Sequence, residues 1–235
     1  GAAAAGVELV VCVGTDLATS IQAVELAEAV AAGELGDGLP EVAAVVGLHP
    51  HEAEQDLAPV AELLRNRRSA ISGVGECGLD YHYDHADRGA QRKAFAAQVG
   101  LAQELDLALV IHVREAFEDL FAILGTEGVP ERTVVHCFTG GPTEAEAALA
   151  LGLQLSFSGV VTFKNAADLR EAVLATPPGR FTVETDAPFL APVPHRGKAN
   201  LPEYVSVVGE FVAELRGEEA GNLAATTTST ARSLF

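Results

Sequence analysis

The chain has 235 residues, of which 49% are hydrophobic and 20% charged, a composition typical of a globular protein that buries a large core. No apolar run reaches the ~18 residues that a membrane span needs, and the first residues lack the basic stretch of a signal peptide. The formal net charge of −18 argues against broad attraction to nucleic-acid phosphates, so a phosphoester substrate would require bound metal and local basic residues.

Short apolar runs and helical stripes alternate from the first residues to the last. The runs predict strands over residues 7–13, 42–48, 70–74, 107–111, 133–135, 153–157 and 180–183. Apolar residues at helical spacing predict helices over about 17–32, 54–67, 89–105, 115–124, 143–151, 165–175 and 201–215, with short helical pieces over 218–235. Connections of helix length require parallel strands.

Seven strand–helix units lie one short of a (β/α)8 TIM barrel, so we predict an α/β protein of this class with one domain over residues 1–235. The missing strand is expected upstream of Gly1, in agreement with the absence of any methionine from the chain, and the domain is then N-terminally incomplete. A doubly wound open sheet is the competing interpretation, but it would scatter the residues at the strand ends along an edge.

Four residues that bind metals well follow four of the predicted strands: Glu76, His112, His136 and Asp186. The carboxyl ends of barrel strands share one rim, where functional residues gather. Two imidazoles and two carboxylates suit Zn²⁺, Mn²⁺ or a similar cation. The sequence therefore predicts a metal site. The glycines around Glu76 do not have P-loop spacing, and we expect them to let the backbone pack close to the metals.

The three cysteines, Cys12, Cys77 and Cys137, are odd in number and far apart. Packed, reduced thiols are the prediction, and they favour a cytoplasmic location. Cys77 and Cys137 each follow a predicted ligand, so strand alternation should point them away from the metal site.

At these strand ends the chain resembles the TatD-type metal-dependent deoxyribonucleases of the amidohydrolase superfamily. The resemblance covers essentially the whole chain and rests on six motifs in order: Gly47-Leu-His-Pro-His51, Gly75-Glu-Cys-Gly-Leu-Asp80, Ile111-His-Val-Arg-Glu115, Val135-His-Cys-Phe-Thr-Gly140, Glu184-Thr-Asp-Ala-Pro188 and Ala191-Pro-Val-Pro-His-Arg-Gly-Lys198.

The resemblance implies a hydrolase that cleaves phosphodiesters with a water activated by two divalent metal ions. Glu76 would bridge the ions, His112 and His136 would bind one of them, and Asp186 would bind the other and orient or deprotonate the water. Two ions about 3.5–4 Å apart stabilise both oxygens of an in-line displacement. The identity of the metal, Mg²⁺, Mn²⁺ or Zn²⁺, stays open.

The chain departs from the family at its start, because a His-x-His pair that follows the family's first strand has no counterpart before Gly14. We interpret this pair as lying upstream of the sequence. A genuine loss would leave one metal held only by Glu76 and Asp186, and would favour a metal-poor, inactive binding protein.

Further residues near the strand ends are expected to bind substrate. His49 and Arg114 are predicted to contact phosphate, with a helix cap as the alternative for His51 and an ion pair with Glu115 as the alternative for Arg114. Arg196, with its neighbours His195 and Lys198, forms a local basic loop suited to a DNA backbone.

Two more side chains have predicted roles of other kinds. Glu184 is expected to brace the metal ligands. Tyr81, in a polar loop with His82 and His85, is a candidate for stacking on a base.

The functional hypothesis is a cytoplasmic TatD-like DNase, a 3′ exonuclease acting on single-stranded DNA or 3′ ends, with no membrane association and no obligate protein partner. The alternative enzyme is an amidohydrolase-superfamily hydrolase of a small phosphoester, amide or lactone. Many of those enzymes bridge their metals with a lysine, whereas here Glu76 takes that position.

Overall fold

The computed structural model describes all residues 1–235. The chain divides into two compact units, Glu8–Val134 with Phe235, and Gly1–Val7 with Val135–Leu234. The boundary between Val134 and Val135 falls inside the fifth strand. The prediction of one domain over the whole chain stays a prediction.

Seven strands occur where seven were predicted, in the order β1-β2-β3-β4-β5-β6-β7. They are β1 (Leu9–Val13), β2 (Glu41–Val46), β3 (Gly73–Asp80), β4 (Ala108–Arg114), β5 (Thr133–Val135), β6 (Gln154–Phe157) and β7 (Phe181–Val183). The main difference is in β3, which was predicted to end at Val74 and instead continues to Asp80.

The helices also alternate with the strands as predicted. They are α1 (Leu17–Ala31), α2 (Ala58–Asn66), α3 (Arg88–Leu105), α4 (Phe117–Glu127), α5 (Pro142–Ala150), α6 (Ala167–Ala175), α7 (Val205–Arg216) and α8 (Ala220–Leu234), with short 3-10 helices at Ala2–Ala5, Pro50–Glu52, Arg68–Ala70, Gly159–Thr162 and Pro202–Tyr204.

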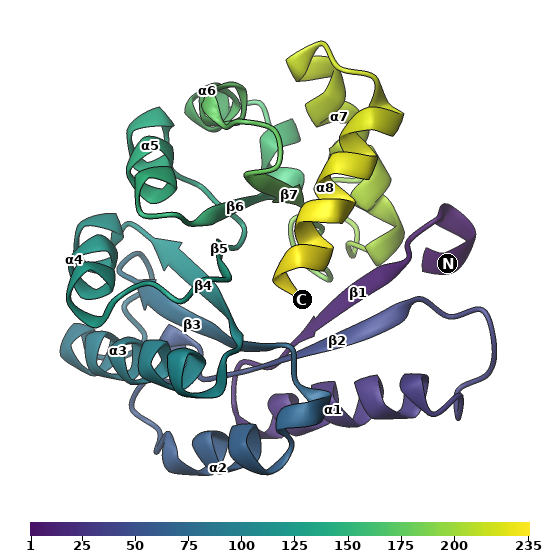
Figure 1. Cartoon of the computed structure of the whole chain (residues 1–235). Coiled ribbons are helices and arrows are strands. Elements are labelled where there is room, and N and C mark those ends of the chain that lie inside the picture. The colour runs from purple at the N-terminus through teal and green to yellow at the C-terminus, as the bar shows by residue number, and fades with distance from the viewer. The chain divides into compact units, whose positions relative to one another are not determined.

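In the unit Glu8–Val134, β1, β2, β3 and β4 pair side by side and parallel. Helices α1 to α4 lie along the outer side of these strands (Figure 1). Asp16 caps the first of them, because its Oδ1 accepts the Thr19 N–H at 2.8 Å. This cap satisfies an N–H that the helix itself cannot pair.

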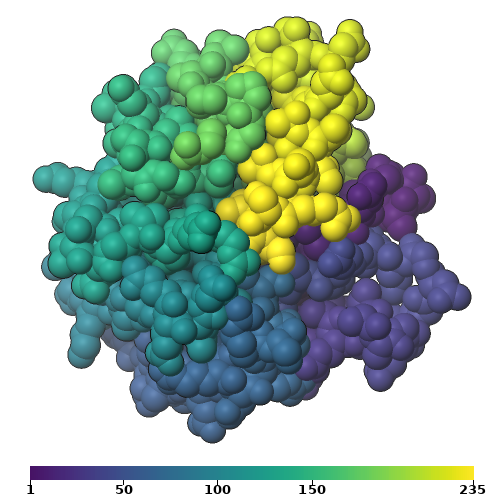
Figure 2. All heavy atoms as spheres, viewed as in Figure 1, coloured from purple at the N-terminus to yellow at the C-terminus, as the bar shows by residue number.

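In the unit Gly1–Val7 with Val135–Leu234, β6 and β7 pair in parallel. Helix α8 was predicted as short pieces but is one continuous helix. Its buried residues recur at helical spacing, at Leu223, Thr227, Thr230 and Leu234. The opposite side of α8 lies at the molecular surface, in yellow in Figure 2.

No helix combines the length and apolar character that crossing a bilayer requires. All three cysteines are free thiols. Cys77 is completely buried, and burial raises its pKa, with a further contribution from the nearby Glu76 charge.

Candidate metal centre

Glu76, Asp80 and His112 come from two neighbouring strands of one unit. The register pairs Gly78 of β3 with His112 of β4, and Asp80 with Arg114. Side chains alternate along a strand, so Glu76 and Asp80 point to the same face. Glu76 therefore lies inside β3 and not beyond its end as predicted.

The glycines beside Glu76 allow β3 to approach β4. A Cβ atom at Gly75 would lie 2.5 Å from the Val110 carbonyl oxygen, and one at Gly78 would lie 1.9 Å from the His112 carbonyl oxygen. Close contact with β4 therefore explains why glycine is needed at these two positions. The close approach of the backbone to metals stays a prediction.

His112 lies between two carboxylates. Its Nδ1 is 2.9 Å from Oε1 of Glu76, and its Nε2 is 3.1 Å from Oδ2 of Asp80. An ionised carboxylate only accepts hydrogen bonds, and neutral His112 has one ring proton to offer to the two carboxylates. One of its two ring nitrogens therefore presents a lone pair to a carboxylate oxygen. Two acceptors this close require a cation or a second proton between them. The donor set therefore fits a divalent metal held by Glu76 and His112.

Asp80 is held in its ionised form by a closed set of donors. Only 1% of its surface is exposed. Its Oδ1 accepts the N–H groups of His82 and Tyr83 at 3.0 and 2.9 Å, and Oδ2 also accepts a hydrogen bond from Nε2 of His51 at 3.1 Å. Burial raises the pKa of Asp80, but hydrogen bonds from His112, the Tyr83 N–H and His51 together hold it well below its ordinary value.

This role of Asp80 was not predicted from the sequence. The signal that reveals it is alternation along β3, because Asp80 lies four residues after Glu76 and thus on its face. His51, for which we expected either phosphate contact or a helix cap, contacts Asp80.

His49 faces the same centre from the segment that follows β2. One ligand atom each from His49, Glu76 and His112 lie within 4.8 Å of one another, and Nε2 of His49 is 3.6 Å from Oε1 of Glu76. However, Nδ1 of His49 accepts the His51 N–H at 3.2 Å. With Nδ1 as acceptor, neutral His49 carries its proton on Nε2 and would act as a donor there, whereas a metal at Nε2 would require that proton to leave.

Two fully buried glutamines of α3 hold the backbone around this centre. Gln98 accepts the Leu48 N–H at 2.8 Å and donates to the Leu48 carbonyl at 3.0 Å, directly before His49. Gln91 accepts the Asp80 N–H at 2.8 Å and donates to the Asp80 carbonyl at 3.1 Å. Each amide thus replaces the pairing that a neighbouring strand would provide. Sequence reasoning missed both residues.

In the other unit, His136 contacts Glu184, the predicted brace. Its Nδ1 is 3.1 Å from Oε1 of Glu184, which also accepts the Cys137 N–H at 2.9 Å. The second oxygen of Glu184 accepts the Ser156 hydroxyl. Burial and the Glu184 charge raise the pKa of the Cys137 thiol to about 12, so this cysteine is a protonated packing residue and not a thiolate ligand.

Asp186, also in this unit, has a left-handed backbone with φ of 59°. Non-glycine residues rarely adopt this conformation, which is concentrated at functional sites.

The predicted phosphate-binding arginines both rest on aromatic rings. The guanidinium of Arg114 lies 4.9 Å from the centre of the Tyr83 ring, while Glu115 pairs with His82. The guanidinium of Arg196 lies 3.7 Å above the Phe163 ring. These contacts fix the arginine planes.

Tyr81 does not offer the open ring that we expected for base stacking. The Arg88 guanidinium lies 4.3 Å from its ring centre, and its hydroxyl donates to Asp119 at 2.5 Å.

Comparison with known proteins identifies the family of this chain. The family model "TatD related DNase" matches residues 1–235. The chain belongs to the TatD family. Among the similar TatD-family proteins is YabD of Bacillus subtilis (strain 168), an uncharacterized metal-dependent hydrolase that is 39% identical over 97% of this chain and 88% of its own length.

Two further relatives are informative about function and fold. The 3′-5′ ssDNA/RNA exonuclease TatD of Erwinia tasmaniensis is 38% identical over 80% of this chain and 76% of its own length. The crystal structure of YjjV, a TatD homolog from Escherichia coli K12, matches 98% of this chain and 87% of its own with a TM-score of 0.89 and 28% identity.

This likeness confirms the predicted (β/α)8 class and the TatD resemblance. It also establishes that the chain is a metal-dependent hydrolase by family.

Proposed function

We propose that this protein is a two-metal nuclease that removes nucleotides from the 3′ ends of single-stranded nucleic acid. The observation that carries the proposal is the placement of His112 between Glu76 and Asp80, because one neutral imidazole cannot donate to both carboxylates, at 2.9 and 3.1 Å, without a cation or a further proton. The printed activity of the Erwinia relative supports the choice of substrate.

Within this proposal Glu76 and His112 would hold metal, and the predicted bridging role of Glu76 would have it shared by the two ions. The ligand roles of His136 and Asp186, the brace role of Glu184 and the choice among Mg²⁺, Mn²⁺ and Zn²⁺ remain predictions from the sequence. When bound, such ions lower the pKa of water and neutralise charge on the phosphodiester. Asp186 is proposed to orient or deprotonate the attacking water.

The remaining predicted residues would hold the substrate. With a proton on Nε2, which lies 3.6 Å from Oε1 of Glu76, His49 is suited to donate to a phosphate oxygen. Arg114 and Arg196, with planes fixed by aromatic contacts, are suited to neighbouring phosphates. The free cysteines favour action in a reducing compartment such as the cytoplasm.

The test is degradation of a 5′-labelled single-stranded oligonucleotide with Mg²⁺, Mn²⁺ or Zn²⁺ and with chelator. We expect a ladder that shortens from the 3′ end only with metal, and loss of that activity in Glu76→Gln and Asp186→Asn. Metal content by mass spectrometry should fall in the same variants. Hydrolysis of small amides or lactones without nuclease activity would instead favour the alternative hydrolase, and an unchanged rate in Asp186→Asn would contradict the mechanism.

A further inference from the structure

Exposed apolar side chains gather in the loop that follows Asp186. The unit Gly1–Val7 with Val135–Leu234 exposes six large hydrophobic residues, and four of them, Phe189, Leu190, Val193 and Leu201, lie in this loop. Phe189 has 68% of its surface exposed, more than any other large hydrophobic residue of the chain. A single exposed apolar residue is ordinary, but a cluster beside a predicted metal ligand suggests a binding surface.

Hydrogen bonds from Asn200 and from the loop backbone hold the loop that carries the exposed Phe189. Asn200, with 2% of its surface exposed, donates from Nδ2 to the carbonyls of Thr185 and Phe189, both at 2.6 Å. The Phe189 N–H donates to the Asp186 carbonyl at 2.8 Å, and the Asn200 N–H donates to the Pro188 carbonyl at 2.9 Å. The ring is therefore presented on the same turn as Asp186.

The charge of this loop is opposite to that of the whole chain. No acidic residue occurs between Asp186 and Glu203, whereas Arg196 and Lys198 lie within this interval. Across the chain, 33 acidic residues outnumber 15 lysines and arginines. A cationic loop is thus placed where an anionic ligand would meet the least repulsion.

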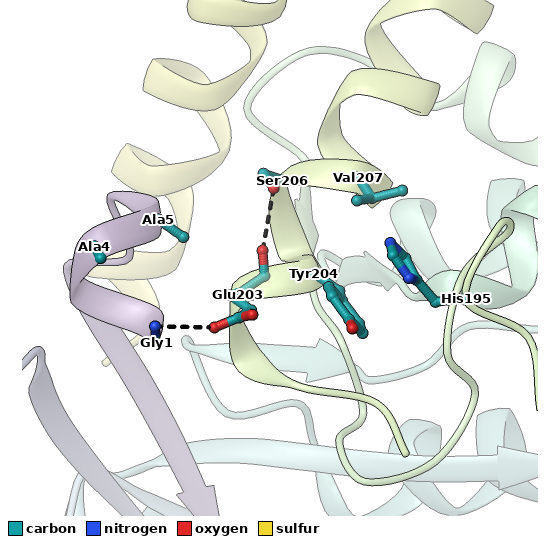
Figure 3. A pocket seen from close by; sticks show the side chains of 8 residues that line it. All are labelled: Gly1, Ala4, Ala5, His195, Glu203, Tyr204, Ser206 and Val207. Atoms are coloured by element: carbon teal, nitrogen blue, oxygen red, sulfur yellow. Dashed lines mark hydrogen bonds and ion pairs between the residues drawn. The ribbon is translucent and has the colours of Figure 1, made fainter. Parts of the chain in front are cut away.

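The other rings of the loop are already engaged. His195 stacks on Tyr204 with ring centres 4.1 Å apart and planes 6° apart, as Figure 3 shows. Arg196 covers Phe163. Phe189 is the exposed aromatic ring among these residues.

We infer that Phe189 stacks on an unpaired nucleobase, with Arg196 and Lys198 beside the adjoining phosphates. This combination of an aromatic platform and cationic side chains is how proteins hold single strands without reading their sequence. A paired internal base has both faces stacked already, so the platform selects single-stranded substrate. The inference rests on the proposed nuclease function and places a base next to the cleaved phosphodiester.

The experiment compares Phe189→Ala with Leu174→Ala, which truncates another exposed apolar side chain, 54% exposed, in the same unit. The probe is a fluorescent oligothymidylate with a phosphorothioate at its 3′-terminal linkage, with binding followed by anisotropy. We expect Phe189→Ala to weaken binding by about five- to 150-fold. Leu174→Ala should bind like the natural protein, and Phe189→Trp should retain affinity.

A second probe isolates the stacking contact. The same oligonucleotide with a 3′-terminal abasic residue lacks the ring that Phe189 would contact. The natural protein and Phe189→Ala should bind this probe equally. A defect of the same size on both probes would overturn the inference.

Hydrolysis of bis(p-nitrophenyl) phosphate separates this inference from the function on which it rests. The natural protein and Leu174→Ala should hydrolyse this ester at equal rates, which reports the metal centre in the absence of a nucleobase. If the natural protein degrades single strands and Phe189→Ala binds them as well as Leu174→Ala does, the inferred stacking by Phe189 is wrong, while the proposed nuclease function is supported. If the natural protein neither binds nor degrades single strands, the proposed function fails and the inference fails with it. A dimer that Phe189→Ala dissociates, with unchanged nucleic-acid binding, would assign this surface to self-association and overturn the inference.

Discussion

Asp80 determines which nitrogen of His112 is available to a metal. Its Oδ2 lies 3.1 Å from Nε2 of His112, and a proton held on Nε2 by this carboxylate would leave the lone pair of Nδ1 toward Glu76. Asp80→Asn removes the charge that fixes this tautomer, and such changes typically cost 10–100-fold in metal affinity. We expect Mn²⁺ binding by calorimetry to weaken within that range.

Asp84→Asn is the matched control for this prediction. Asp84 lies four residues later, and its carboxylate pairs with Arg88 at the surface. This variant should bind Mn²⁺ with unchanged affinity. Equal affinities for the Asp80 and Asp84 variants would show that His112 does not depend on Asp80.

Single residues also show where sequence reasoning ends. The strand-end pattern predicted roles for Glu76 and His112, and the structure places Oε1 of Glu76 2.9 Å from Nδ1 of His112. It gave Asp80 no role, because the strand was expected to stop at Val74. The donor character of His49 depends on an N–H from His51 that points at Nδ1, and the order of residues alone does not reveal that direction.

At the scale of elements, α3 contributes more than a cover for the sheet. Gln91 and Gln98 lie two turns apart on this helix and bond to the backbones of Asp80 and Leu48. Gln91→Leu would leave buried N–H and C=O groups without partners. Since such groups cost about 1–3 kcal/mol, we expect the free energy of unfolding to fall by that amount in urea denaturation.

Gln103→Leu provides the control within the same helix. Gln103 is exposed and donates to the Glu127 carbonyl at 3.0 Å. Its replacement should change the free energy of unfolding by less than about 0.5 kcal/mol. Equal losses in the two variants would contradict the role assigned to the buried amide.

Element boundaries were less predictable than element order. The alternation of strands and helices follows directly from apolar periodicity, whereas β3 continues past Val74 through a glycine-rich stretch, residues 75–80, that is poor in β-forming residues. Helix α8 contains consecutive threonines of low helix propensity. Thr227 and Thr230 satisfy their hydroxyls on the Leu223 and Thr226 carbonyls, which lets one continuous helix form.

For the whole molecule, negative charge makes metal binding a source of stability. With a net charge of −18, and with Glu76 and Asp80 both next to His112, the folded chain concentrates carboxylates that a divalent cation would neutralise. Metal at 100 times its dissociation constant would contribute about 2.7 kcal/mol if only the folded state binds it. We expect chelator to lower the unfolding temperature and Mn²⁺ to restore it.

The variant Glu76→Gln tests whether the predicted site is responsible for this stabilisation. Its unfolding temperature should respond much less to chelator and Mn²⁺ in calorimetric scans. A shift as large as that of the natural protein would mean that the stabilising metal binds elsewhere.

The two buried amides of α3 have a mechanical consequence. Helix α3 is hydrogen-bonded both to Leu48, which precedes His49, and to Asp80. A shift of this helix would therefore move both backbone positions together. A compound or substitution that acts on the solvent side of α3 would then change both the proposed phosphate contact of His49 and the metal affinity at His112, without touching a group that takes part in the chemistry.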